Sequence, residues 1–248
     1  MFARLLASPT AAYVLPLVLF VLLNTLPDFF RIENSELPWH VSAPEHWVYP
    51  LQTVLCAGVL LLFRQHYSFN PWRGLGLAFV LGIVGIVVWV APALLREILI
   101  QGGHEPAAWW DWLGLAERKE GFDPGVAADS TLWFSLAVGM RFARMVLVVP
   151  FVEELFWRGF LMRFLLTEDG RFEHVAFGTH RWRIFWIVTI AVMLIHSTTD
   201  YLGAFVWGSL VYFVAVRTRS LGACVFMHAV GNLVLGIYVM KTQQWGFW

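Results

Sequence analysis

Long apolar runs separated by short polar segments recur along the whole chain. A helix needs about 20 residues to cross the hydrocarbon core of a membrane, and only helices and closed barrels satisfy their backbone polar groups there. The composition, 59% hydrophobic and 14% charged, agrees with membrane helices, because soluble domains carry about 25% charged residues. We therefore predict an all-α, polytopic transmembrane helix bundle of seven or eight helices. The seven candidate runs are residues 10–27, 47–63, 75–95, 132–149, 184–196, 201–216 and 221–240.

The fourth apolar run leaves the helix count open. It carries Arg141 and Arg144 at membrane depth, and Pro150 follows it directly. A proline either kinks one long helix or begins a new one. The first outcome predicts seven spanning helices, and the second predicts eight.

Basic residues alternate between the loops that join these runs. Arg4, the 64–73 loop, the 167–183 loop and the 217–220 turn are basic, whereas the intervening loops are not. The positive-inside rule therefore predicts that these segments, including the N-terminus, are cytoplasmic. The formal net charge is zero, so the chain has no charge pattern typical of nucleic-acid binding.

Residues 151–160 place two adjacent carboxylates and an arginine inside an otherwise apolar stretch. Ionisable groups in such surroundings are costly and indicate a function or a partner. If the stretch is helical, Glu154 and Arg158 lie one turn apart on the same face, in the better orientation for an ion pair. Glu153 then points about 100° away. This stretch alone leaves two interpretations open: a salt bridge that fixes helix packing, and a catalytic site.

Three further polar side chains occur inside the C-terminal apolar runs. His196 ends one run, and His228 and Asn232 lie four residues apart in the last run, so that one helical face presents both. A single histidine in an apolar run is more often a hydrogen-bonded core residue than a catalyst. Several such groups in consecutive helices favour a shared site, because convergence would offset the cost of burying each one.

The chemistry of these groups points to hydrolysis. A carboxylate near a histidine can hold a water molecule and remove its proton. A second histidine and an asparagine can donate hydrogen bonds to a carbonyl oxygen as it becomes an oxyanion. This set is sufficient for peptide hydrolysis without a serine or cysteine nucleophile. Ser197 lies beside His196 without a G-x-S-x-G motif, and helix-end hydrogen bonding next to Asp200 is the favoured interpretation.

Metal binding is the nearest competing hypothesis. Glu153, His196 and His228 would form a His₂Glu ligand set with an open position, as in catalytic zinc sites. No H-E-x-x-H motif is present. We therefore predict no certain cofactor and keep a divalent metal, zinc, as an alternative.

The polar residues of the last helices resemble the motifs of the CPBP family of intramembrane proteases, which includes the type II CAAX prenyl endopeptidases and CAAX protease-related proteins. The family pattern is E-E-x-x-x-R, then F-x-x-x-H, then H-x-x-x-N or H-x-x-x-D on successive helices. Residues 153–158 match the first motif fully, and residues 228–232 match the third. The second motif is partial, because His196 is present and Val192 stands in place of phenylalanine. The substitution removes a packing ring and no catalytic group.

The resemblance covers residues 132–240 and implies a role for each polar group. Glu153 would activate the water with help from His196. The oxyanion site would be formed by His228 and Asn232.

The same resemblance implies that Glu154 and Arg158 support the geometry of the site. We interpret residues 1–248 as one integral membrane domain, in which residues 1–131 form generic spans and loops and residues 132–240 form the catalytic helices. We expect the protein in the inner, or plasma, membrane of a bacterium, with its N-terminus in the cytoplasm.

These residues together predict an intramembrane, glutamate-dependent endopeptidase. Its expected partners are membrane lipids and a peptide or protein substrate at the membrane, for which the family name suggests lipid-modified, CAAX-like C-terminal tails. The alternative is a non-enzymatic transporter or immunity-type binding protein that uses the buried charges as a proton relay or an ion-pair lock. The amide of Asn232 favours the enzyme, because an oxyanion site needs a donor there and a relay needs a titratable group.

Overall fold

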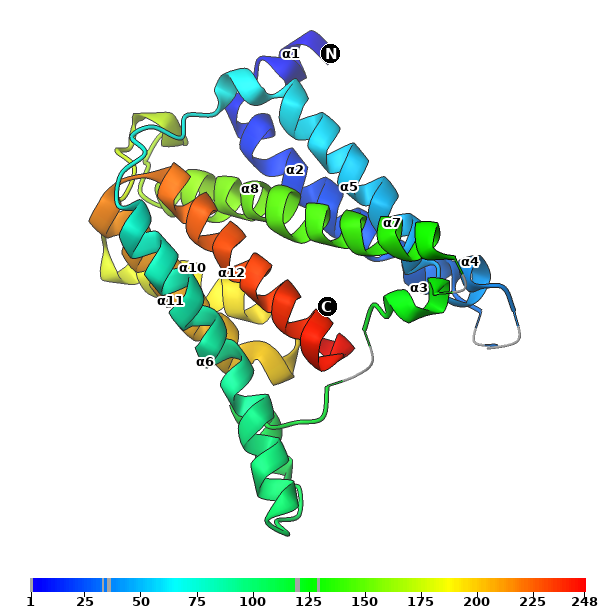
Figure 1. Cartoon of the computed structure of the whole chain (residues 1–248). Helices are drawn as coiled ribbons and strands as arrows, with labels where there is room; N and C mark the ends of the chain where they lie inside the picture. Colours follow the sequence, from blue (N-terminus) through cyan, green and yellow to red (C-terminus); the bar gives the residue numbers. More distant parts are fainter. Residues whose placement is uncertain (1, 33, 35–36, 119–120, 129) are drawn as a thin grey trace. The chain divides into compact units, whose positions relative to one another are not determined.

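The computed structural model describes every residue except 1, 33, 35–36, 119–120 and 129 (Figure 1). The described residues form helices, turns and loops without any strand, which confirms the all-α prediction. The longer helices are α2 (Pro9–Asn24), α5 (Glu45–Leu62), α6 (Leu75–Gln101), α7 (Thr131–Phe142), α10 (Trp182–Leu194), α11 (Tyr201–Thr218) and α12 (Leu221–Thr242). The shorter ones are α1 (Phe2–Leu6), α3 (Leu26–Phe30), α4 (Trp39–Ser42), α8 (Val149–Glu154) and α9 (Met162–Phe164).

Several of these helices have the length and apolarity needed to cross a membrane, so the chain is an integral membrane protein. Each of the seven predicted apolar runs is helical, but α10 is shorter than a span, and α5 carries Glu45, His46 and Gln52. The predicted count of seven or eight spanning helices is therefore not confirmed. Among the described residues, five stretches qualify: Pro9–Phe30, Leu75–Gln101, Thr131–Phe164, Thr198–Thr218 and Leu221–Thr242.

The helix that contains Pro150 continues through it. A π-helical segment, η4 (Ala143–Val148), joins α7 to α8, and the proline lies in the first turn of α8. The Val149 N–H donates to the carbonyl of Arg144, five residues earlier, which is the hydrogen-bond pattern of a π-helix. Pro150 therefore begins no separate eighth helix, and the outcome observed is one long helical stretch.

The chain forms two compact units, each of which combines segments that are far apart in the sequence. The first unit contains Met1–Ser68, Glu120–Phe156 and Gly236–Trp248. The second unit contains Phe69–Lys119 and Trp157–Leu235. The long helix of residues 131–164 thus contributes to both units.

Arg144 organises the interior of the first unit, where α2 and α5 run side by side (Figure 1). Its Nε donates to Oε1 of Gln52 over 2.7 Å, and its Nη2 donates to Oδ1 of Asn24 over 2.7 Å. The guanidinium carbon lies 4.3 Å from the ring centre of Tyr49 and 4.9 Å from that of Phe20. Amide oxygens and aromatic faces therefore stabilise a cation that the apolar surroundings would otherwise exclude.

A second arginine of the first unit is held in an aromatic cage. The Arg141 guanidinium carbon lies 5.3 Å from the ring centres of Tyr49 and Phe122, and 5.7 Å from that of Trp248. The side chain is buried. Cation–π contacts of Arg141 therefore connect the helix of residues 131–164 with α5 and with Trp248.

The second unit depends on close helix approaches at glycine. Helix α11 packs against α6 and α10. A Cβ on Gly82 of α6 would lie 2.8 Å from the carbonyl oxygen of Met227, and one on Gly85 would lie 2.7 Å from the indole of Trp207. Small residues at such positions are what allow membrane helices to approach closely.

We expect the substitution Gly82→Val to lower the thermal stability of the protein. The added side chain would collide with the Met227 carbonyl, a backbone atom that cannot rotate away, and overpacking of this kind costs about 1–3 kcal/mol. The melting temperature of the purified protein in detergent measures the effect. Gly76→Val is the matched control on the same helix, because a Cβ there meets no atom within 4 Å. Equal melting temperatures for the two variants would contradict the close approach of α6 and α12.

Candidate active site

The two glutamates of the first motif end helix α8, in the first unit. Glu154 is fully buried, and Glu153 is half-buried. The next residue begins a second π-helical segment, η5 (Leu155–Leu161), so α8 lies between two such segments. Single π-helical turns are rare in proteins and are frequent at functional sites. The glutamate pair therefore occupies a backbone that departs from regular α-helix on both sides.

Arg144 lies on the same long helical stretch as Glu153, in the first unit. The sequence places Arg144 in an apolar run, and no role in the site was predicted for it. The signal that could have assigned one is its position on the same helical stretch as the glutamates, where an unpaired cation would be costly.

Arg158, the last residue of the first motif, lies in the second unit. Its side chain is almost fully buried, and its Nη2 donates a hydrogen bond of 3.2 Å to the carbonyl oxygen of Gly208 on α11. A backbone carbonyl can accept from a buried guanidinium without introducing another charge. This contact fixes Arg158 to the middle of α11. The predicted pairing of Arg158 with Glu154 stays a prediction.

His196 lies just beyond the end of α10, where a hydrogen bond sets its orientation. Its Nδ1 is 2.7 Å from the carbonyl oxygen of Val192. A carbonyl only accepts, so Nδ1 carries the proton and Nε2 of the neutral ring presents a lone pair. The ring also lies edge-on to the indole of Trp89, with 5.5 Å between ring centres. His196 is therefore held in the form that can accept a proton or a hydrogen bond at Nε2.

Val192, where the family motif has phenylalanine, lies where α10 contacts α11. A Cβ on Gly208 would lie 3.5 Å from Cγ1 of Val192, which is an ordinary van der Waals distance. The hydrogen bond to His196 uses the backbone carbonyl of Val192, which any residue supplies.

The third motif lies on α12, as its spacing predicts. His228 is buried, and its ring packs edge-on against Trp207 with 5.4 Å between ring centres and an interplanar angle of 72°. Asn232, one turn further along α12, is half-buried. A Cβ on Gly231 would overlap the indole of Trp207, so the glycine within the motif makes room for that ring.

Helix α11 is the common support of the polar groups of the second unit. Consecutive residues, Trp207 and Gly208, contact His228 and Arg158 respectively. Trp207 and Trp89 could not be predicted as site neighbours, because a tryptophan in a membrane helix is an ordinary apolar residue and neither has a fixed spacing from a motif.

The serine beside His196 has the structural role that was predicted. Ser197 Oγ donates to Oδ2 of Asp200 over 2.6 Å, at the start of η7 (Thr198–Asp200). Asp200 in turn forms an ion pair of 2.6 Å with Arg118. The hydroxyl is therefore engaged in local loop structure.

The six predicted polar residues divide between the two units. Glu153 and Glu154 belong to the first unit, and the other four belong to the second. Within the second unit, α11 connects Arg158 with His228. Among the described residues of either unit, no cluster of three or more His, Cys, Asp or Glu side chains is arranged to hold a metal ion.

Comparison with known families identifies the segment that carries these groups. Residues 132–234 match the family model of the type II CAAX prenyl endopeptidase Rce1-like proteins. No curated protein and no solved structure matched the chain. The matched segment contains all six predicted site residues, and it leaves the first three predicted spans outside. The match makes residues 132–234 similar to a membrane endopeptidase domain of the CAAX protease type.

We expect the imidazole of His196 to carry its proton on Nδ1. The reason is the 2.7 Å contact with the Val192 carbonyl, which can only accept. Nitrogen NMR of protein labelled in histidine distinguishes the two neutral tautomers. His196→Gln assigns the signal by removing it. A predominant Nε2–H tautomer at His196 would overturn this orientation.

Proposed function

We propose that the protein is an intramembrane endopeptidase that hydrolyses a peptide bond with a water molecule activated by glutamate and histidine. The observation that carries the proposal is the fixed orientation of His196, which presents the Nε2 lone pair within an Rce1-like domain. A histidine held by a backbone carbonyl at Nδ1 is prepared to act as a base or to orient water.

Glu153 is the proposed general base. It is half-buried at the end of α8, on the same long helical stretch as Arg144. An ionised carboxylate can accept the proton of a bound water, and His196 would share in orienting that water. Arg144 is a positioning residue in this scheme.

The oxyanion site is the proposed role of His228 and Asn232. Both lie on α12, and the contact with Trp207 limits the rotation of the His228 ring. Hydrogen-bond donors fixed in a dry site stabilise developing negative charge strongly, because they need no reorganisation during the reaction.

Glu154 and Arg158 are the proposed supporting pair. The carboxylate is fully buried, and the guanidinium is almost fully buried. Two buried ions of opposite charge, four residues apart on one helical stretch, stabilise each other when they pair. Arg158 also donates a hydrogen bond to the carbonyl of Gly208, which fixes its position on α11.

The proposed reaction is a hydrolysis through a tetrahedral intermediate. Glu153 takes a proton from water, and the water oxygen forms a bond to the peptide carbonyl carbon. The carbonyl oxygen becomes an oxyanion and accepts hydrogen bonds from His228 and Asn232. The carbon–nitrogen bond then breaks, and the proton held by Glu153 passes to the leaving amine.

The proposed substrate is a membrane-associated peptide or protein with a lipid-modified, CAAX-like C-terminal tail. This follows the family of the 132–234 domain, which acts on peptides at the membrane. We further propose that residues 132–240 are the catalytic part of one membrane domain. The basic loops favour a cytoplasmic N-terminus in a bacterial inner membrane.

We expect Glu153→Gln to reduce cleavage about 10²- to 10⁴-fold while the protein remains folded, because the amide cannot accept the water proton. The assay is mass spectrometry of the products from a farnesylated CAAX peptide and from a mixture of membrane peptides, with purified protein in detergent.

Glu173→Gln is the matched control, because it makes the same change at an exposed carboxylate outside the motifs. Full activity of Glu153→Gln would refute the assignment of the base. The same assay after chelation tests the zinc-dependent alternative, in which activity and bound metal are lost together.

We expect Asn232→Ala to lower kcat about 10²- to 10³-fold with little change in KM, because an oxyanion donor acts in the transition state and not in the ground state. Steady-state kinetics on the same peptide measure both constants. Thr242→Ala, at the exposed end of α12, should leave them unchanged. A rise in KM at unchanged kcat would assign Asn232 to substrate binding instead.

A further inference from the structure

A pocket of about 880 Å³ lies in the second unit, where α6 begins and α11 ends. Neither the motifs nor the proposed reaction uses it. Its lining combines basic and apolar side chains, among them Arg73, Leu77, Phe213, Arg217 and Arg219.

The basic side of this pocket holds three guanidinium groups, and none of the described residues that line it is a carboxylate. Arg73 is fixed by a hydrogen bond from its Nε to the carbonyl of Thr218. Arg219 caps α11 in a left-handed conformation, with φ of 51°. Cations at a helix C-terminus are favourable, but three of them around one cavity repel each other unless an anion is bound.

The apolar side of the pocket lies next to the cations. Phe213 is one helical turn before Arg217 on α11, and half of its surface is exposed. Leu77 belongs to the first turn of α6. Both helices are candidate membrane spans, so these side chains face a region where hydrocarbon is available. An occupant with one anionic end and one apolar end would fit both sides.

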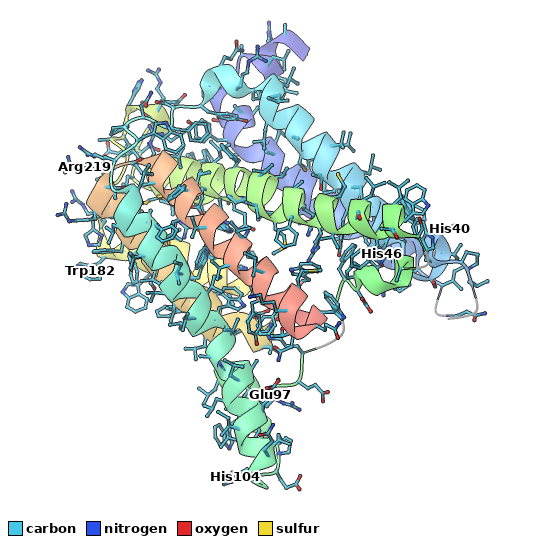
Figure 2. The ribbon with its side chains drawn as sticks, viewed as in Figure 1. His40, His46, Glu97, His104, Trp182 and Arg219 are labelled. Atoms are coloured by element: carbon cyan, nitrogen blue, oxygen red, sulfur yellow. The ribbon has the colours of Figure 1, made fainter. Side chains whose placement is uncertain are left out.

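The pocket lies at one end of its unit. In Figure 2, Arg219 lies beside the beginning of α6, whereas Glu97 and His104 lie toward the other end of that helix. Trp72 and Trp182 are exposed and belong to the segments just before α6 and at the start of α10. Exposed tryptophans are typical of the membrane–water interface. This position at the helix ends agrees with the level of lipid headgroups.

We propose that this pocket binds an anionic phospholipid. Arg73, Arg217 and Arg219 contact the phosphate of the headgroup, and an acyl chain lies along Phe213 and Leu77. Guanidinium groups suit phosphate because they donate several hydrogen bonds in a planar array. Basic pockets at the ends of membrane helices recognise anionic headgroups in this way. The proposal does not depend on the proposed peptidase activity.

The test is native mass spectrometry of the full chain in detergent, titrated separately with phosphatidylglycerol and phosphatidylcholine. We expect the wild-type protein to bind phosphatidylglycerol in preference. The double variant Arg217→Gln, Arg219→Gln should lose about tenfold or more of that affinity. Arg181→Gln with Arg183→Gln removes the same charge from exposed positions at the start of α10 and should retain the affinity for phosphatidylglycerol.

Phe213→Ala, at an exposed position, provides a second variant that does not alter the charge. This variant should lower the affinity for long-chain phosphatidylglycerol more than the affinity for a short-chain analogue. Equal affinity for the two lipids, or an equal loss in the control double variant, would overturn the proposal. Displacement of the lipid by inorganic phosphate or glycerol phosphate at similar concentration would show a soluble-anion site and would also overturn it.

Discussion

The energetic cost of an ionised side chain in apolar surroundings is the constraint on which this structure depends. Two amide oxygens and two aromatic faces stabilise the Arg144 guanidinium. A backbone carbonyl accepts a hydrogen bond from Arg158. Each solution joins helices that are distant in the sequence, because the acceptors come from α2 and α5 in the first unit and from α11 in the second. The buried charges therefore determine which helices contact one another, in addition to any role in catalysis.

Much of the fold and part of the site could be predicted from local patterns. The apolar runs gave the helices, the i, i+4 spacing placed His228 and Asn232 on α12, and Ser197 bonds Asp200 as expected. The continuity through Pro150 could not be predicted, because a π-helical turn depends on packing and not on composition. Contacts such as that of Arg144 with Gln52 join residues far apart in the chain, and no local pattern encodes them.

Helix α11 contacts both Arg158 and His228 in the second unit, although it contains none of the motif residues. The Gly208 carbonyl accepts a hydrogen bond from Arg158. The adjacent Trp207 fills the space left by glycines on α6 and α12 and contacts His228. A motif search does not find residues that support a site from a neighbouring helix, although such residues position the functional side chains.

The central claim is the proposal that Glu153 and His196 act on the same water molecule. A double-mutant cycle tests it most directly, with Glu153→Gln, His196→Gln and the combined variant compared in single-turnover cleavage at high enzyme concentration. Residues that act as one unit are strongly non-additive. We predict that the combined variant is about as slow as the slower single variant. A loss equal to the product of the two single losses would contradict the account.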